Sequence, residues 1–319
     1  MFHILKEDIM EENIEIMNLL QNKQLLEHEL QSLAYGSVEI RENDSNKYIY
    51  VHYREDGVTL TKYVGEYSDE LYNLVLNNSI KAKELKKQIR EINKKLKQLN
   101  YTEEELSEKV EQNIDFAKRH LVDTIYKQAI LEGVATTFAD TESIIEGGKV
   151  NNMTSEDVMK IVNLKHAWEF ILNKNVILSN TNFALLCKIN KMVEEGFYYT
   201  AGKIRNTPVT IGGTTWKPDL PIESVIKEEL EEIFNKKLND VDRAIEFLLY
   251  TMKKQIFIDG NKRTAVIYSN HYLISKGKGI IAIPAEMTQE FKELLIPYYE
   301  GKDEKQIKKF IKEKCYMSI

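Results

Sequence analysis

The spacing of apolar side chains changes several times along the chain. Apolar residues recur at helical spacing over 3–35, which predicts a long helix. Residues 48–53 and 58–64 are instead rich in β-branched and aromatic side chains, and a turn sequence lies between them at 55–57. This composition predicts a β-hairpin. The helical period returns over 69–99, so the N-terminal region is expected to run helix, hairpin, helix.

The helix predicted at 69–99 has a distinctive pattern of its own. Its apolar residues alternate in steps of four and three, as in a coiled-coil seam, at Leu85, Ile89, Ile92, Leu96 and Leu99. The segment 81–97 is otherwise strongly basic and contains only Glu84 and Glu91 as acids. Two interpretations stay open: a solvated helix face, or a surface for nucleic acid or another acidic partner. Self-association through this region is a further expectation.

A boundary is expected where the basic run ends. Thr102 and Glu105 have the spacing of a capping box, which predicts a new helix start. We therefore divide the chain into an N-terminal interaction region, 1–100, and a second domain, 103–319. The second domain is mainly α. Its helices are predicted at 103–133, 140–146, 154–173, 181–195, 222–236, 240–253, 262–276, 287–299 and 303–315.

One segment interrupts this helical pattern. Residues 202–211 contain two short β-type runs around a turn at 206–208, and this predicts a second hairpin. The fold class expected from the whole pattern is mainly α with small hairpins.

Bulk properties narrow the class of protein. The chain has 319 residues and a formal net charge of −6, so nothing in its overall charge favours nucleic acid. Two cysteines support neither a disulfide framework nor a cysteine zinc site. The sequence lacks an apolar run long enough to span a bilayer, and its acidic N-terminus is unlike a signal peptide. A cytoplasmic protein without a membrane partner is expected.

The segment 259–265, Asp-Gly-Asn-Lys-Arg-Thr-Ala, carries the strongest chemical signal. A turn at Gly260 leads into a helix, whose first backbone N–H groups and positive dipole end attract anions. Lys262 and Arg263 add cations at the same end. Asp259 supplies a carboxylate that suits a divalent ion accompanying phosphates. These residues predict a phosphate site with a metal ligand beside it.

The run from Phe257 to Arg263 resembles the core motif of the Fic (Fido) family, His-x-Phe-x-Asp/Glu-Gly-Asn-Gly/Lys-Arg. The resemblance extends over roughly residues 120–315 and implies a Fic-type helical domain with a β-hairpin flap. It implies that Phe257 anchors the motif loop in the core. It also implies ATP and Mg²⁺ as cofactors, with AMP transferred from ATP to a Ser, Thr or Tyr hydroxyl of a protein.

Roles for individual residues follow from the same resemblance. Asp259 would bind Mg²⁺, and Arg263 would contact a terminal phosphate. Gly260, Asn261 and Lys262 would form the anion hole through backbone and side chain. The hairpin at 202–211 would dock a target protein by strand addition, with contacts from Lys203, Ile204, Arg205, Val209 and Thr210.

The family also has an inhibitory helix with the pattern Ser/Thr-x-x-x-Glu-Gly/Asn, whose glutamate blocks productive nucleotide binding. Glu146 and Gly147 resemble the end of this pattern, within a helix at about 140–147, although Glu142 occupies the Ser/Thr position. Many members pair this glutamate with a second motif arginine. Val266 stands there in this chain, so Lys262 or Arg263 would have to be the partner of Glu146.

Gln255 is the most consequential departure, because the family has a histidine there as general base. A glutamine amide does not take up a proton near neutral pH. His271 lies ten residues after Asn261 on the predicted helix, about 15 Å along its axis, too far to substitute. Three functions stay open: an adenylyltransferase of reduced activity, a degenerate protein that binds nucleotide or target without turnover, and a phosphotransferase resembling Doc, which shares the lysine at 262.

Overall fold

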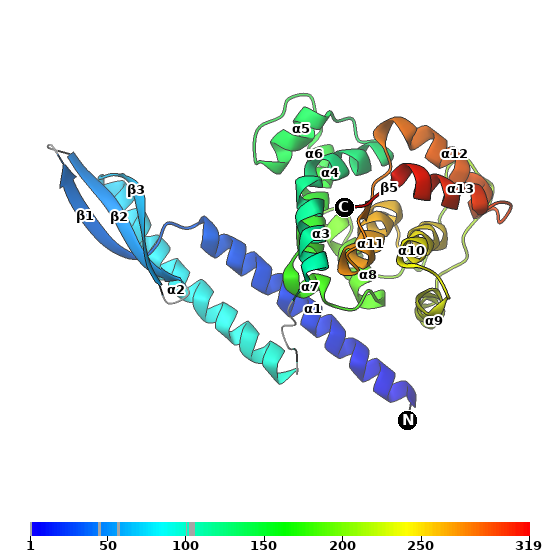
Figure 1. Ribbon diagram of the computed structural model, residues 1–319, viewed down its shortest axis with the longest axis horizontal. Helices are drawn as coiled ribbons and strands as arrows, with labels where there is room; N and C mark the ends of the chain where they lie inside the picture. Colours follow the sequence, from blue (N-terminus) through cyan, green and yellow to red (C-terminus); the bar gives the residue numbers. More distant parts are fainter. Residues whose placement is uncertain (1, 44–45, 56–57, 100, 102–105) are drawn as a thin grey trace. The chain divides into compact units, whose positions relative to one another are not determined.

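The chain forms two compact units, Met1–Thr102 and Glu103–Ile319. The computed structural model describes residues 2–43, 46–55, 58–99, 101 and 106–319, with side chains from Glu15 onward except at 55 and 58. Residues 56–57 of the turn predicted at 55–57, and the capping box of Thr102 and Glu105, lie outside these residues. Each unit is coloured along the chain in Figure 1 and is described by itself.

The first unit contains two long helices and a three-stranded antiparallel sheet. Its elements are α1 (Phe2–Ser32), β1 (Ser37–Asn43), β2 (Asn46–Glu55), β3 (Val58–Glu66) and α2 (Asp69–Gln98). The strands follow one another in the order β1-β2-β3. The predicted hairpin is β2 and β3. Sequence analysis did not identify β1, in which charged residues alternate with Val38 and Ile40.

The sheet and the start of α2 share one hydrophobic core. Ile49 and Val51 on β2 and Val75 on α2 are completely buried, and Val38, Val64 and Leu71 are among the side chains that pack around them. Further along α2, Leu85 and Leu96 of the predicted seam are buried as well. The alternation along β2 thus supplies one face for α2 to cover.

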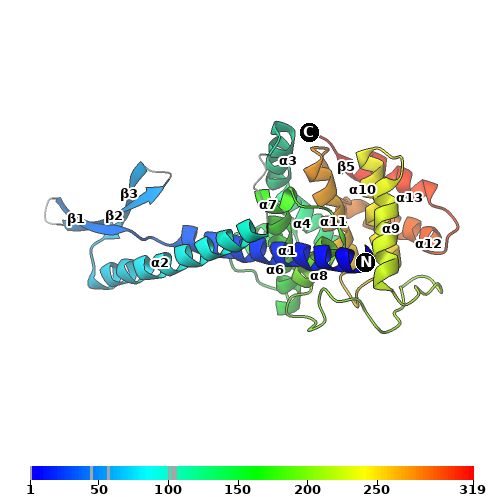
Figure 2. The ribbon, with the colours of Figure 1, turned by 90° about the horizontal axis from the view of Figure 1, so that it is seen from below.

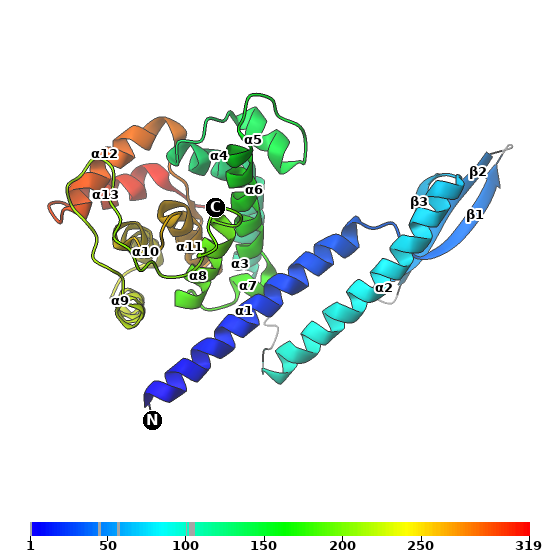
Figure 3. The same ribbon diagram turned by 180° about the vertical axis from the view of Figure 1, so that it is seen from behind.

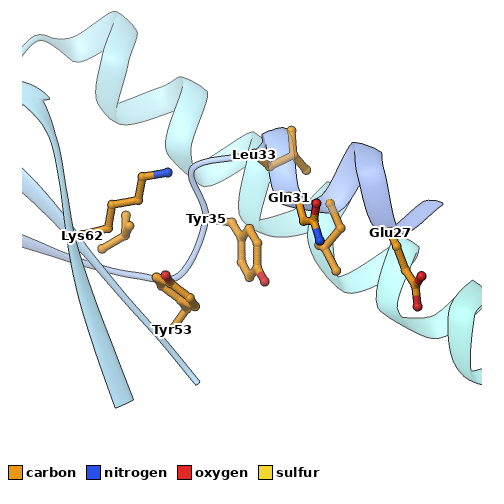
Figure 4. A pocket seen from close by; sticks show the side chains of 8 residues that line it. Glu27, Gln31, Leu33, Tyr35, Tyr53 and Lys62 are labelled. Carbon is orange, nitrogen blue, oxygen red and sulfur yellow. The ribbon is translucent and has the colours of Figure 1, made fainter. Parts of the chain in front are cut away.

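A cavity of about 340 Å³ lies within this unit. Figure 4 shows Tyr35, Tyr53 and Lys62 around it, with Glu27 and Gln31 on α1. The rings of Tyr35 and Tyr53 are 5.9 Å apart between centroids. The lining belongs wholly to the first unit, so the phosphate-site residues 259–263 take no part in it.

The second unit is helical. Its helices are α3 (Glu108–Arg119), α4 (Leu121–Leu131), α5 (Phe138–Ile145), α6 (Ser155–Ile171), α7 (Lys174–Ile177), α8 (Phe183–Val193), α9 (Glu223–Asn235), α10 (Asp240–Lys254), α11 (Asn261–Ser275), α12 (Thr288–Tyr299) and α13 (Lys305–Phe310). A 3₁₀ turn, η1 (Ala285–Met287), precedes α12, and a π-helical turn, η2 (Ile311–Cys315), follows α13. Two short strands, β4 (Ile280–Ile281) and β5 (Tyr316–Met317), pair antiparallel.

Helix α11 lies at the centre of this unit. It contacts α3, α6, α7, α8, α10 and β4, and Figures 2 and 3 show it among these neighbours from two sides. A helix buried on all sides needs partners for its polar side chains. Asn270 meets this need by donating to the carbonyl of Ile281 (2.8 Å) and accepting from its N–H (2.8 Å). This packing fixes the position of the first residues of α11.

The structure corrects several predicted elements. The helix predicted at 103–133 is two helices that meet at His120, whose N–H is shared between the carbonyls of Phe116 and Ala117. Helix α7 was not predicted. The hairpin predicted at 202–211 is absent, because residues 199–222 contain no strand. Among the described residues, no helix combines the length and hydrophobicity needed to cross a membrane.

Candidate active site

The turn before α11 depends on a glycine. Gly260 precedes the helix with φ of +72°, a left-handed conformation that side chains disfavour. A Cβ at this position would also collide with the carboxylate of Glu194, which lies against the turn. The sequence pattern identified this glycine correctly, and its tight neighbour explains why a larger residue does not fit.

Asn261 holds the motif loop together. Its side-chain oxygen accepts from the Phe257 N–H (3.0 Å), and its amide donates to the Phe257 carbonyl (2.8 Å). The Phe257 ring is buried in the core. The Asn261 side chain is therefore engaged within the loop, and its backbone N–H remains to line the anion hole that the resemblance implies.

The start of α11 presents free backbone donors. Within the described part of the chain, no acceptor bonds to the N–H groups of Asn261, Lys262 and Arg263. The N–H of Gly260 differs, because it donates to its neighbour Asp259 at 2.7 Å. Three consecutive free donors at the positive end of a helix are an arrangement that favours anions.

The two cations of the motif are already paired with carboxylates. Glu132 lies 3.4 Å from Lys262 Nζ and 3.7 Å from Arg263 Nε. Glu194 lies 2.8 Å from Arg263 Nη2, and Asp259 lies 3.6 Å from the same atom. Glu132 follows the last residue of α4, and Glu194 follows the last residue of α8. The C-terminal ends of α4 and α8 thus place two carboxylates beside the start of α11.

These ion pairs leave Arg263 incompletely bonded. Its side chain is only 3% exposed, yet Nε and Nη1 have no hydrogen-bond acceptor among the described residues. The oxygens of Glu132 and Glu194 that face Lys262 and Arg263 Nη2 are also buried and make ion pairs without a well-formed hydrogen bond. Buried donors of this kind are costly unless an acceptor arrives. The arginine is therefore poised to bind an additional anion.

The expected ion pair between Glu146 and the cations of the motif does not form among the described residues. Lys262 and Arg263, the expected partners of Glu146, pair with Glu132 and Glu194 instead. The described residues include no ion pair of Glu146, which caps α5 before Gly147. Glu132 is also followed by a glycine, Gly133, at φ of +79°.

The sequence held a weak signal for Glu132, because a second Glu-Gly pair occurs at 132–133. Gln128 stands where the family pattern has Ser or Thr, four residues earlier. Its amide donates to the Arg263 carbonyl at 2.7 Å, and its oxygen accepts from Trp168 at 2.9 Å. Gln128 and Glu132 thus fasten the end of α4 to the motif.

Glu194 is an unusual carboxylate that the sequence gave no reason to select. Its side chain is 2% exposed. Burial raises the pKa of Glu194 to about 7, even though the Arg263 guanidinium acts in the opposite direction. The nearby charges of Asp259 and Glu132 add to the increase. The ionised form is thus disfavoured by its surroundings.

Asp259 has the exposure and chemistry of a metal ligand. Its side chain is 51% exposed, with one oxygen on the Gly260 N–H and the other near Arg263. The described residues contain no cluster of three His, Cys, Asp or Glu side chains able to hold a metal by themselves. Mg²⁺ is commonly bound through one or two carboxylates together with substrate phosphates. Asp259 fits such a shared site.

Gln255 ends α10 in a left-handed conformation, with φ of +49°. Its amide donates to the Met252 carbonyl (2.6 Å), and its oxygen accepts from the Asn261 amide (3.3 Å). His271 is fully buried between Thr181 and the Val176 carbonyl. It therefore takes no part in the site, as its distance along α11 predicted.

Arg205 organises the segment where a flap was expected. Its guanidinium donates to the carbonyls of Gln255 (2.6 Å), Thr207 (2.8 Å) and Asp219 (2.6 Å). Because Arg205 is buried, the assignment of this residue to target docking is wrong. Lys203 and Thr210 are exposed, whereas Ile204 and Val209 are half-buried. Arg205 links this segment to the motif loop.

Asn190 on α8 makes a second link between these two segments. It accepts from the Gly202 N–H (2.8 Å) and donates to the Asp259 carbonyl (3.0 Å) and to Thr264 Oγ1 (3.1 Å). Loop 255–260 is therefore held from three directions: Asn190, Arg205 and Asn261. Sequence reasoning missed the first of these, since a lone asparagine within a helix carries no local signal.

Comparison with known proteins agrees with this geometry. Residues 180–273 match the model of the Fic/DOC family. No protein of curated function matches the chain by sequence.

Solved structures share the fold. Fic-1 from C. elegans aligns with a TM-score of 0.51 and 16% identity, over 74% of this chain and 72% of that chain. A substituted form of the same fragment aligns with a TM-score of 0.51 and 17% identity, over 76% and 77%. A Fic domain containing signaling protein from Bacteroides thetaiotaomicron gives a TM-score of 0.49 and 17% identity, over 60% and 75%.

Proposed function

We propose that the chain binds ATP at the start of α11 and transfers AMP to a protein hydroxyl at a reduced rate, from the premise that residues 180–273 form a domain of the Fic/DOC family. The hydroxyl oxygen would form a bond to the α-phosphate, and the bond to the β-phosphate would break with release of pyrophosphate. The observation that carries the proposal is the set of unsatisfied donors at this helix end. Three backbone N–H groups and two guanidinium nitrogens of Arg263 lack acceptors among the described residues. Phosphate oxygens would satisfy all of them.

Lys262 would complete this cradle. Its side chain is one-third exposed, and its ammonium lies 3.4 Å from Glu132. When a nucleotide binds, a phosphate oxygen would replace this carboxylate as the partner of Lys262. Asp259 would hold Mg²⁺ together with the phosphates, and the bound ion would supply charge neutralisation there.

Gln255 determines the expected rate. Without a base to accept the proton of the attacking hydroxyl, transfer should be slower by about 10²–10⁴-fold. The Gln255 oxygen could still accept a hydrogen bond and align the hydroxyl, while the cradle continues to stabilise phosphate charge. Slow transfer is therefore the expected activity.

Glu132 would regulate access to the cradle. Its side chain is 12% exposed, and its carboxylate pairs with both cations that a terminal phosphate requires. An ATP molecule must displace this carboxylate to reach Lys262 and Arg263. We assign to Glu132 the inhibitory role that the sequence resemblance placed on Glu146.

A second candidate is a protein that binds nucleotide without turnover. The observation in its favour is that both polar groups of the Gln255 side chain already have partners, Met252 and Asn261. A side chain held in this way would have to give up a hydrogen bond in order to align a hydroxyl.

Labelled ATP separates these functions. The Glu132→Gln chain, alone and with Gln255→His added, is incubated with Mg²⁺, a protein mixture and ATP labelled at the α- or γ-phosphate. We expect α-label on protein with both chains, about 10²–10⁴-fold faster after Gln255→His. Adding Asp259→Asn should abolish labelling.

Each contrary outcome has a distinct meaning. Label from the γ-phosphate would replace AMP transfer with phosphoryl transfer, as in the Doc-like alternative. ATP binding without any label in the Glu132→Gln chain, but with label after Gln255→His, would establish the second candidate. Absence of ATP binding in both chains would contradict the proposal as a whole.

A further inference from the structure

Two glutamates contact Arg263, and they are held very differently. Glu132 is 12% exposed and lies 3.7 Å from Nε, whereas Glu194 is 2% exposed and lies 2.8 Å from Nη2. The Glu194 carboxylate also packs directly against the turn at Gly260. A phosphate that enters the cradle can therefore displace Glu132 toward solvent. Glu194 has no such route, and it stays beside the arginine.

The charge of the cradle shows why this matters. Two cations, Lys262 and Arg263, face three carboxylates, Glu132, Glu194 and Asp259. When a nucleotide displaces Glu132 and a metal ion compensates Asp259, the Glu194 carboxylate remains on Arg263 beside the phosphates. Burial raises the pKa of Glu194 to about 7 against the effect of Arg263, and the charges of Asp259 and Glu132 add to the increase.

Arg263 also has contacts that Glu194 does not supply. Its backbone carbonyl accepts from Gln128 at 2.7 Å, and its Nη2 lies 3.6 Å from Asp259. A glutamine at 194 would have nearly the same shape and would keep an oxygen for Nη2. Loss of the negative charge is then the dominant consequence of Glu194→Gln.

We propose that Glu194 is a fixed carboxylate that competes with the terminal phosphate of the nucleotide for Arg263, and that it thereby lowers affinity for a nucleoside triphosphate more than for a diphosphate. The inference rests on the proposed function, because it takes the cradle to be a nucleotide site. It assigns to Glu194 a part in setting which phosphate chain the site accepts.

The test compares nucleotide affinities of matched variants. ATP and ADP dissociation constants are measured by calorimetry at fixed Mg²⁺ for the full chain carrying Glu132→Gln. The same measurements follow with Glu194→Gln added, or with Glu195→Gln added as control. Glu195 is the adjacent acid and is exposed. We expect Glu194→Gln to tighten ATP binding by about tenfold, ADP binding by less, and Glu195→Gln to change either by less than about twofold.

The outcomes distinguish this inference from the proposed function. If the Glu132→Gln chain binds ATP but Glu194→Gln leaves the affinity unchanged or weakens it, Glu194 only positions Arg263, and the inference is overturned while the proposed function stands. If no variant binds either nucleotide, the proposed function fails and the inference with it.

A measurement without substitution at 194 covers the case in which Glu194→Gln does not fold. The carboxyl carbon of Glu194 is followed by NMR in the ¹³C-labelled Glu132→Gln chain at neutral pH. A phosphate placed beside this carboxylate should shift its resonance toward the protonated form when ATP is added. A resonance that does not respond to saturating ATP would overturn the inference.

Discussion

At the scale of single residues, two cations and three carboxylates meet at the start of α11. Gly260 and the cations at 262 and 263 follow one another in the chain, so their joint position at a helix start can be predicted from local rules. Glu132 and Glu194 reach the same place from the ends of two other helices. Their arrival depends on packing around α11, which no local pattern encodes.

The two Glu-Gly pairs illustrate this limit. Glu132 and Glu146 each stand at the end of a helix, and each is followed by a glycine with positive φ. Only the end of α4 is joined to the motif, through Gln128. The Glu146–Gly147 pair resembles the family pattern except at Glu142, yet the described residues include no ion pair between Glu146 and the cations of the motif.

The two glutamates can be separated by matched substitutions. Glu132→Gln removes the carboxylate that competes with phosphate, so the ATP affinity of the chain should rise about tenfold or more. Glu146→Gln should change it by less than about twofold. Titration calorimetry with ATP and Mg²⁺ measures both. If Glu146→Gln raises ATP affinity more than Glu132→Gln does, the inhibitory role belongs to Glu146.

At the scale of elements, most helices are predicted closely and the flap is not. Helices α6, α8, α9, α10, α11 and α12 lie within a few residues of their predicted bounds. Hydrophobic period and capping residues are local properties, and Thr154 caps α6 as expected, accepting from the Asp157 N–H. Residues 202–211 have strand-like composition. The buried Arg205, however, donates hydrogen bonds to a carbonyl of its own segment and to that of Asp219.

Arg205 should therefore be essential to the order of this segment. Arg205→Ala removes donors to several carbonyls at once and should lower the free energy of unfolding by about 2–4 kcal/mol. Lys203→Ala, at an exposed neighbour, should lower it by less than about 0.5 kcal/mol. Urea denaturation followed by circular dichroism measures both changes. Equal effects of the two substitutions would show that the carbonyl contacts of Arg205 contribute little to stability.

At the scale of the whole molecule, the change of apolar period predicted a helix and hairpin region followed by a helical domain. The structure has two compact units, Met1–Thr102 and Glu103–Ile319. The basic residues of α2 remain a proposed surface for an acidic partner. Lys81 is already paired with Glu29 on α1 at 2.5 Å. The central position of α11 was beyond prediction, because it results from contacts with six other elements.

Two buried groups in the second unit give its stability opposite pH dependences. Burial lowers the pKa of His271 to about 4. The stability that the buried, neutral imidazole contributes is therefore present above pH 6.5 and is lost as pH falls toward 4. Burial raises the pKa of Glu194 to about 7, so folding is penalised at pH 7 and the penalty disappears as pH falls toward 4.5. The two effects largely cancel in the wild-type chain.

Glu194→Gln should remove this compensation. Between pH 7 and 4.5 the variant should lose about 2 kcal/mol more stability than the wild type, because only the His271 effect remains. Urea denaturation at a series of pH values measures the difference. Parallel curves for the two proteins would contradict the assignment of opposing groups.

The central claim is that residues 259–263 hold nucleotide phosphates. The most direct test is the dissociation constant of ATP with Mg²⁺ for the Glu132→Gln chain, with and without Lys262→Met. Methionine keeps the apolar stem of the partly exposed Lys262 and removes only its charge. We predict that Glu132→Gln binds ATP and that Lys262→Met weakens this binding about tenfold or more. Equal ATP affinity in the two chains would contradict the claim.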